Sequence, residues 1–193
     1  MTRQRLIETA GAVLMERGYA GLSTNEVANR AGVSRGTLLH HFPSRAALVA
    51  AAVEHLLSQR TEAVMAQLAT VDAAMSIREI LHAVWPAFQD PTFAVWASLW
   101  AEAHRDPELA AQLLEVDRRF TETTRQGFAG LAQQFGTVDP ADAVMVRDFL
   151  FALLVGLGFQ HLLPRDRRSV DGYFSLAARA AEAMLEGREQ AER

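Results

Sequence analysis

The sequence predicts an all-α protein of about nine helices, and two features of the 193-residue chain carry this prediction. Apolar residues recur at intervals of three and four, for example at Leu6, Ala10 and Val13, which is the spacing of one face of a helix. Helix-breaking residues divide the chain into segments of helical length, whereas the alternating pattern typical of strands is weak. We expect two domains, a small N-terminal one at residues 1–46 and a larger helical one at residues 47–193.

The composition favours a soluble, cytoplasmic protein. The chain has no cysteine, so it cannot form a disulfide framework, which fits a reducing compartment. Residues 1–5 are basic but lack the apolar run that follows the basic end of a signal peptide. The longest apolar run, residues 149–159, is shorter than the roughly 20 residues needed to span a bilayer.

Charge is distributed unevenly along the chain. The net charge is −4, which alone argues against a nucleic-acid partner. Residues 1–48, however, carry six arginines and three acidic residues, a net charge of +3, while the remainder carries −7. Local field rather than total charge attracts DNA, so this asymmetry indicates that only the N-terminal part meets phosphate.

The first three helices are expected at residues 2–17, 24–31 and 35–41. Ser23 stands three residues before Glu26, which is the spacing of a capping box, in which each side chain bonds the backbone amide at the other's position. We therefore expect the second helix to begin directly after Ser23.

The turn after the second helix has the residues that a helix-turn-helix needs. Gly32 can adopt the left-handed conformation that ends a helix, Val33 can fill the angle between the helices, and Ser34 can cap the next helix. Two short helices joined in this way form the unit that places its second helix in the major groove of DNA.

An ordered series of residues runs through this segment: Gly18-Tyr19, Leu22-Ser23-Thr24, Val27-Ala28, Ala31-Gly32-Val33-Ser34, Gly36-Thr37-Leu38, His41-Phe42 and Leu48. The series resembles the DNA-binding domain of TetR-family regulators and covers about a quarter of the chain. The resemblance implies a homodimer on a double-stranded DNA operator. It also implies that the third helix enters the major groove while the second helix and the start of the fourth, expected at about 44–69, hold the backbone.

We expect Ser23, Thr24 and Asn25, at the start of the second helix, to contact DNA. Thr24 falls in the first turn, where unpaired backbone amides and the positive end of the helix dipole favour a phosphate. The alternative role of Thr24 is that of an ordinary cap. Asn25 either reaches a base or remains in solvent.

In the third helix, Arg35 is the residue expected to read sequence, because its guanidinium can donate two hydrogen bonds to the edge of a guanine. The alternative is that Arg35 contacts only phosphate. Gly36 allows the backbone to approach DNA closely and Thr37 offers a hydroxyl or a methyl to a base, although both residues also suit a helix start. Ser34 and His40 complete the expected contacts of this helix, His40 through a phosphate.

Leu39 departs from the family, which usually has a tyrosine there to bond a phosphate, so that contact is absent or is supplied by a neighbour. Arg45, where the family commonly has lysine, is expected to clamp a phosphate at the start of the fourth helix. The adjacent His40 and His41 are not expected to hold a metal. Successive helix positions point about 100° apart, and no cysteine or acidic residue is near in sequence.

Large apolar residues gather between positions 76 and 135, and this region is expected to bind a small-molecule effector. Helical bundles commonly hold ligands between their helices, although aromatic residues are also the usual content of a core. Residues 96–109 resemble the body of the branch of the family that includes choline-responsive repressors, without identifying an effector. The candidate effector-binding residues are Trp85, Phe88, Trp96, Trp100, His104, Phe120 and Phe159.

No enzyme motif competes with this interpretation, and neither a cofactor nor a metal is expected. Glu102, His104 and Asp106 could suggest acid–base chemistry or a metal site. Pro107 indicates that their helix is ending, and the spacing matches known ligand patterns poorly. We interpret these residues as solvated charges at a helix end.

The last two helices, expected at about 139–163 and 169–187, suit dimerisation. The segment 149–155 is apolar on nearly all sides, which implies burial against its own domain and against a second surface. The alternative is a simple core. The candidate dimerisation residues are Phe151, Val155, Gly158, Tyr173, Ala177 and Ala181.

Together these features predict a ligand-responsive, dimeric transcriptional regulator, and specifically a repressor that a small molecule releases from a palindromic operator. Two alternatives remain. One is an activator of the same architecture. The other is an enzyme or a partner-binding helical body that carries a vestigial helix-turn-helix.

Overall fold

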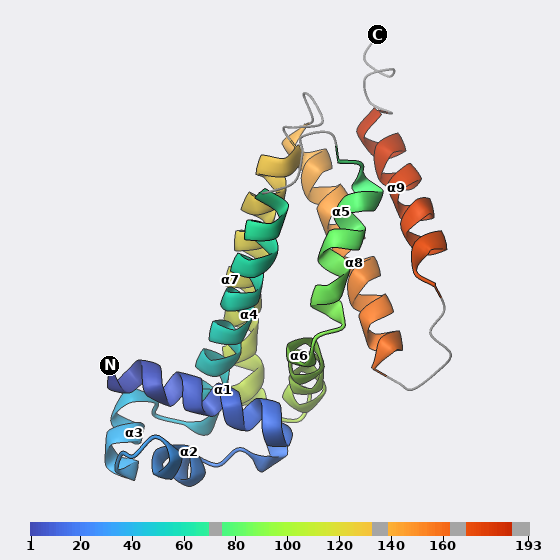
Figure 1. The fold of residues 1–193 in the computed structure, drawn as a ribbon. Helices are drawn as coiled ribbons and strands as arrows, with labels where there is room; N and C mark the ends of the chain where they lie inside the picture. Colours follow the sequence, from blue (N-terminus) through green and yellow to red (C-terminus); the bar gives the residue numbers. More distant parts are fainter. Residues whose placement is uncertain (70–74, 133–138, 163–168, 187–193) are drawn as a thin grey trace. The chain divides into compact units, whose positions relative to one another are not determined.

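The computed structural model describes residues 1–69, 75–132, 139–162 and 169–186. These ranges contain nine α-helices, one short 3-10 helix and no strand (Figure 1), so the predicted all-α fold is confirmed. The helices are α1 (Thr2–Gly21), α2 (Thr24–Arg30), α3 (Arg35–His41), α4 (Arg45–Ala69), α5 (Ile77–Val84), η1 (Trp85–Phe88), α6 (Pro91–Ala103), α7 (Pro107–Ala132), α8 (Pro140–His161) and α9 (Asp171–Glu186). Among the described helices, none combines the length and the apolar character needed to cross a lipid bilayer.

The chain divides into two compact units. The first comprises Met1–Arg60 and Pro91–Thr121, and the second comprises the described residues of Thr61–Asp90 and Glu122–Arg193. The first unit is therefore larger than the predicted domain at residues 1–46, because α6 packs against α1. Helices α4 and α7 contribute residues to both units.

Helix α1 changes conformation at Gly18, as the sequence predicts. Leu6, Ala10 and Leu14 lie on one side of the helix and are fully buried. At Gly18 the backbone adopts φ 66° and ψ −175°, a conformation that glycine enters without steric cost. The regular helix therefore ends there, and the chain turns towards α2.

The helix-turn-helix has the expected local geometry. Gly32 has φ 63°, the left-handed conformation that terminates a helix. The Ser34 hydroxyl accepts a hydrogen bond from the Thr37 amide at 3.1 Å and so caps α3. Only half of the predicted capping box forms at α2. The Ser23 hydroxyl accepts from the Glu26 amide at 3.2 Å, but the Glu26 carboxylate pairs with arginines instead of reaching back to Ser23.

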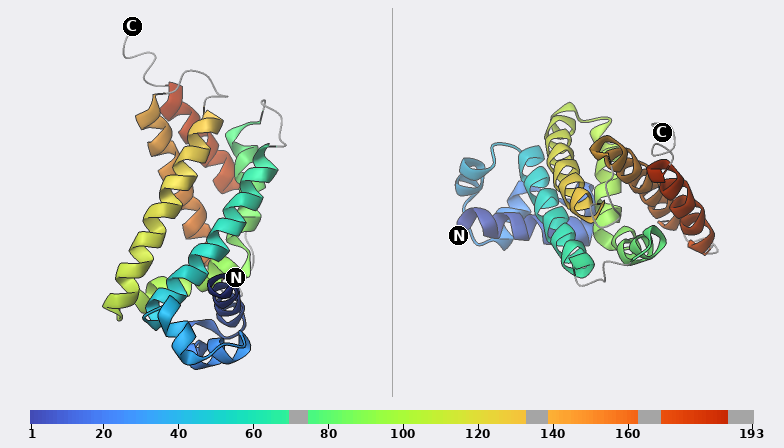
Figure 2. Two further views of the ribbon diagram at one scale, coloured as in Figure 1. Left: turned by 90° about the vertical axis from the view of Figure 1, so that its left-hand side faces the viewer. Right: turned by 90° about the horizontal axis from the view of Figure 1, so that it is seen from above.

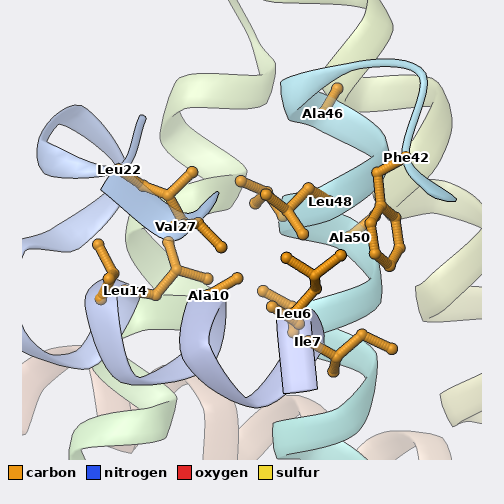
Figure 3. Packing of buried hydrophobic residues seen from close by; sticks show 14 of the residues in the cluster. Leu6, Ile7, Ala10, Leu14, Leu22, Val27, Phe42, Ala46, Leu48 and Ala50 are labelled. Atoms are coloured by element: carbon orange, nitrogen blue, oxygen red, sulfur yellow. The ribbon is translucent and has the colours of Figure 1, made fainter. Parts of the chain in front are cut away.

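A single hydrophobic cluster holds the first unit together. Figure 3 shows side chains of α1, including Leu6 and Leu14, facing Val27 of α2 and Leu48 of α4. Leu38 of α3 is fully buried in the same cluster. The cluster also takes in residues of α6 and α7, namely Leu99, Ala103, Leu109, Leu113 and Val116.

The second unit has its own core, built on α5, α8 and α9. Figures 1 and 2 show α9 beside both α5 and α8. Phe174 of α9 is fully buried, and its ring packs edge-on against Trp85 with centroids 5.8 Å apart. Leu81, Leu150 and Ala181 are buried in the same cluster.

A buried arginine lies between α7 and α8 in this unit. The Arg147 side chain is only 8% exposed and donates to Asp148 Oδ1 at 2.7 Å. It also hydrogen-bonds Thr124 and lies over the Phe151 ring at 4.6 Å. Arg125 donates to the other carboxylate oxygen of Asp148 at 2.7 Å. Burial opposes the ionised form, but the hydrogen bonds from Arg125 and Arg147 hold the pKa of Asp148 below its usual 3.8.

Because the pKa of Asp148 is lowered on folding, its carboxylate stabilises the fold above about pH 4 and loses this effect as the pH falls through the folded-state pKa. We expect Asp148→Asn to reduce the free energy of unfolding by about 1 kcal/mol at pH 7, a value that allows for solvent screening. Below pH 3 the difference from the unsubstituted chain should shrink, as measured by urea unfolding at several pH values. Glu62→Gln, an exposed change on α4, is the control. An equal loss at pH 7 and below pH 3 would contradict this account of Asp148.

Candidate nucleic-acid interface

Helix α3 has one buried face and one exposed face. Leu38 and, just after the helix, Phe42 are buried in the first unit. The exposed positions are Arg35, Gly36, Leu39 and His40, with Thr37 half-buried beside them. Five residues predicted to contact DNA therefore lie on or beside this exposed face, namely Ser34, Arg35, Gly36, Thr37 and His40.

Arg35 is free to bind an external partner. Within the described residues its guanidinium has neither a hydrogen bond nor an ion pair, and it is exposed at the first position of α3. Two other arginines of this unit are neutralised. Arg30 pairs with Glu16 and Glu26, each at 2.7 Å, and Arg17 pairs with Glu26 at 3.5 Å. The positive charge of the first 48 residues is thus available in only a few places, one of which is α3.

Three polar residues lie at the start of α2, namely Ser23, Thr24 and Asn25. Thr24 is half-buried in the first turn, and Asn25 beside it is exposed. The first amides of a helix point out of its end and favour an anion. The Ser23 hydroxyl already accepts a hydrogen bond from the Glu26 amide, so Ser23 caps α2. This geometry leaves Thr24 and Asn25 as the more available DNA-contact candidates at this helix.

Arg45 has partners inside the first unit that the sequence did not predict. Its Nε donates to the Leu22 carbonyl at 2.9 Å, its Nη2 donates to the Tyr19 carbonyl, and its guanidinium carbon lies 3.9 Å from the centroid of the Tyr19 ring. These contacts tie the start of α4 to the segment before α2. The guanidinium therefore has a structural role inside the unit, and a phosphate contact by Arg45 stays a prediction.

The two histidines of α3 have different environments. His40 is exposed and His41 is half-buried, and their rings meet edge to face with centroids 5.5 Å apart. No group of three or more metal-ligating side chains suited to an ion occurs in the described parts of the chain. The exposed ring of His40 remains a candidate for a phosphate contact.

The candidate effector-binding residues fall into two groups. Trp96, Trp100, His104 and Phe120 belong to the first unit, while Trp85, Phe88 and Phe159 belong to the second. The seven residues are thus divided between the two units, and their role in binding an effector stays a prediction.

Packing explains several of these aromatic residues. Trp85 is 7% exposed and meets Phe88, His161 and Phe174 with ring centroids 6.4, 4.9 and 5.8 Å away. This supports the core interpretation of Trp85 over the pocket interpretation. On α6, Trp96 and Trp100 are half-buried and pack edge to face at 6.0 Å.

The acidic residue before α7 was misjudged from sequence. Asp106 does not act as a solvated helix-end charge, because its Oδ1 accepts from the Leu109 amide at 3.0 Å and its Oδ2 accepts from the Tyr19 hydroxyl at 2.9 Å. The aspartate-proline pair at a helix start could have identified the cap, since proline favours the first helical position. No local sequence signal could have identified Tyr19 as the partner. Glu102 and His104 are exposed, as expected.

The candidate dimerisation residues are also divided between buried and exposed positions. Ala177 and Ala181 are 3% and 0% exposed, and Gly158 is buried as well. Their small size serves packing within their own unit and leaves almost no surface for a partner. Phe151 and Val155 are half-buried, and Tyr173 is 39% exposed.

The candidate dimerisation residues chosen from sequence left out the more exposed apolar side chains of α8 and α9, although Phe149 lies in the apolar segment 149–155 and Phe159 was assigned to the effector. Met145 and Phe149 of α8 are 54% and 41% exposed, Phe159 is 44% exposed, and Leu176 of α9 is 60% exposed. The signal was present, because residues 145, 149, 152, 156 and 159 recur at intervals of four and three and so share one helix face.

Comparison with known proteins agrees with this geometry. Residues 6–52 match the family described as bacterial regulatory proteins, tetR family, and residues 73–186 match the BetI-type transcriptional repressor, C-terminal family. The chain is 32% identical over 167 residues to the HTH-type transcriptional regulator CymR of Pseudomonas putida, covering 86% of this chain and 82% of that protein. It is 28% identical over 193 residues to the HTH-type transcriptional regulator BetI of Stenotrophomonas maltophilia, covering 93% and 94%.

Solved structures show the same fold. A transcriptional regulator from Saccharomonospora viridis in complex with choline has a TM-score of 0.63 and 25% identity, with 93% of this chain and 95% of that chain covered. The multidrug binding protein EbrR complexed with imidazole has a TM-score of 0.65 and 23% identity, with 96% and 95% covered. These relatives are regulators rather than enzymes, and the two matched segments span most of the described chain. The protein therefore belongs to the TetR family of bacterial helix-turn-helix transcriptional regulators, with a BetI-type C-terminal part.

Proposed function

We propose that this protein is a repressor that binds a palindromic operator as a homodimer and is released from it by a small-molecule effector. The observation that carries the proposal is the unpaired, exposed Arg35 on a capped helix whose opposite face is anchored in the core. An arginine in this position can donate two hydrogen bonds to guanine in the major groove. Repression is supported by the match of residues 73–186 to BetI-type repressors.

The exposed apolar face of α8 and α9 supports the homodimer. Large apolar side chains that share one face and remain exposed typically mark an interaction surface. The spacing along α8 places Met145, Phe149 and Phe159 on one such face, and Leu176 of α9 adds an exposed side chain. Pairing these helices with those of a second copy buries this face. The same pairing sets a fixed separation between two recognition helices, which a palindromic operator matches.

Release follows from a change in that separation. An effector shifts the equilibrium only if it binds more tightly to the DNA-incompetent form than to the DNA-bound form. The half-buried aromatic residues Trp96 and Trp100 remain candidates for contact with it. Solved relatives hold choline or imidazole, which supports a small organic effector here.

Arg35→Ala should remove sequence discrimination while leaving the fold intact, because Arg35 is exposed and has no hydrogen bond or ion pair among the described residues. We expect the preference for the selected operator over random DNA to fall roughly 10- to 100-fold, the worth of one bidentate base contact. The measurement is competition binding on an operator obtained by selection from random duplexes. Arg118→Ala, an exposed arginine of α7 paired with Glu115, is the control. Unchanged discrimination in Arg35→Ala would remove the base-reading role from this residue.

Leu39 provides a second, apolar contact on the same face. It is 39% exposed and lies one helical turn after Arg35, so we expect it to touch the 5-methyl group of a thymine. Replacing successive thymines of the operator by deoxyuridine should weaken binding about three- to tenfold at one position, the order of one buried methyl. The same thymine replacement should leave the binding of the Leu39→Ala protein to the operator unchanged. If the methyl effect persists in Leu39→Ala, another residue makes the contact.

Leu176→Glu should shift the protein from dimer to monomer, because a charge placed in an apolar interface costs several kcal/mol unless it is paired. Sedimentation velocity at a series of concentrations measures the shift. Leu114→Glu is the matched control, since Leu114 is similarly exposed, at 56%, but lies on α7 in the first unit. If Leu176→Glu dimerises as well as the unsubstituted protein, the dimer interface does not include Leu176 of α9.

A further inference from the structure

Three side chains from distant parts of the sequence meet in the first unit. The Tyr19 hydroxyl donates to Asp106 Oδ2 at 2.9 Å, across 87 residues of sequence. Asp106 Oδ1 accepts from the Leu109 amide at 3.0 Å and so caps the first turn of α7. Capping requires only one carboxylate oxygen. The second oxygen therefore makes a contact that capping does not explain.

The ring of Tyr19 contacts the start of α4. The guanidinium carbon of Arg45, the first residue of α4, lies 3.9 Å from the centroid of the tyrosine ring. Arg45 in turn donates to the carbonyls of Tyr19 and Leu22. Leu22 immediately precedes the cap of α2. One set of contacts thus joins the first turn of α7, the first turn of α4 and the entry to the helix-turn-helix.

The protonation states of these groups maintain the contacts. Burial, followed by the hydrogen bond to Asp106, raises the pKa of Tyr19, although the charge of Arg45 opposes the shift. The hydrogen bonds from the Leu109 amide and then from Tyr19 lower the pKa of Asp106. The tyrosine therefore remains a donor and the carboxylate remains an acceptor at neutral pH.

We propose that Asp106, Tyr19 and Arg45 form a relay that couples the first turn of α7 to the position of the DNA-binding helices. All three are positioning residues, and none needs to touch DNA or effector. Helix α7 is continuous from Pro107 to Ala132 and includes Arg125, which contacts α8 in the second unit. A displacement of α7 along its axis pulls on Tyr19 and Arg45 and shifts the segment that orients α2 and α3. The part of this inference that concerns DNA rests on the proposed function.

Two substitutions, one at each partner, remove the hydrogen bond between Tyr19 and Asp106 while keeping the other local contacts of the substituted residue. Tyr19→Phe keeps the ring over Arg45 but removes the hydroxyl. Asp106→Ser keeps a good helix cap but is too short to reach Tyr19. The matched control is Asp139→Ser, because Asp139 also caps a helix that begins with proline, through the Ala141 amide at 2.7 Å, and lies in the second unit. Asp106→Asn keeps the cap through Oδ1, and its Nδ2 can donate to the Tyr19 hydroxyl oxygen, so the link to Tyr19 is kept with the hydrogen bond reversed and this variant serves as the conservative rescue.

Hydrogen–deuterium exchange on the free protein tests the relay without DNA. Asp106→Ser should accelerate amide exchange in residues 22–30 and 45–49 about threefold or more, the order expected for one lost hydrogen bond. Asp139→Ser should leave these peptides unchanged, and Asp106→Asn should restore near-normal exchange. The double variant of Tyr19→Phe and Asp106→Ser should match the stronger single variant, because both remove one link. Unchanged exchange in residues 22–30 and 45–49, or additive effects in the double variant, overturns the relay.

A second arm adds operator DNA. Coupling is reciprocal, so operator binding should slow exchange in residues 107–112 of the unsubstituted protein, and this slowing should be at least halved in Tyr19→Phe. A purely structural role of Tyr19 predicts the same DNA-induced slowing in both proteins and would overturn the relay. Failure to select any operator would instead count against the proposed function, while the measurement on free protein would still decide the relay.

Discussion

The recognition helix depends on the shared core beneath it. Helices α2 and α3 contain seven residues each, and isolated helices shorter than about 12 residues are marginal in water. Their stability must therefore come from caps and from burial of one face. Leu38 of α3 and Val27 of α2 are fully buried against α1 and α4. The same burial determines which residues of α3 remain exposed, so the core of the first unit defines the face that we propose reads DNA.

Arginine pairing then decides where positive charge is available on this surface. Six arginines lie in the first 48 residues, but Arg17 and Arg30 are paired with glutamates and Arg45 is bound to backbone carbonyls. Arg35 carries no such partner among the described residues. A uniformly basic surface would attract any duplex, whereas one free guanidinium on the recognition helix favours specific base contacts over general phosphate attraction.

Polar contacts in the two units differ in their burial. In the second unit, Arg147 is nearly buried and shares Asp148 with Arg125, an arrangement that would be costly if either charge lost its partner. In the first unit, the contact of Asp106 with Tyr19 lies near the surface and joins elements far apart in sequence. The first arrangement resists change in its packing, while the second is the contact that we propose transmits a small displacement between helices.

The sequence by itself determined the all-α class, the turn at Gly32, the cap at Ser34 and the exposed Arg35, because these features depend on local periodicity and on backbone preferences a few residues long. Only the tertiary structure decided the contacts of Arg45 inside the first unit, the link from Tyr19 to Asp106, the burial of Ala177 and Ala181, and the division of the aromatic residues between two units. The physical reason is the range of the interactions. A cap or a left-handed glycine needs neighbours within about four residues, whereas burial and side-chain pairing depend on which helices meet, and the sequence pattern of one helix does not specify its neighbours.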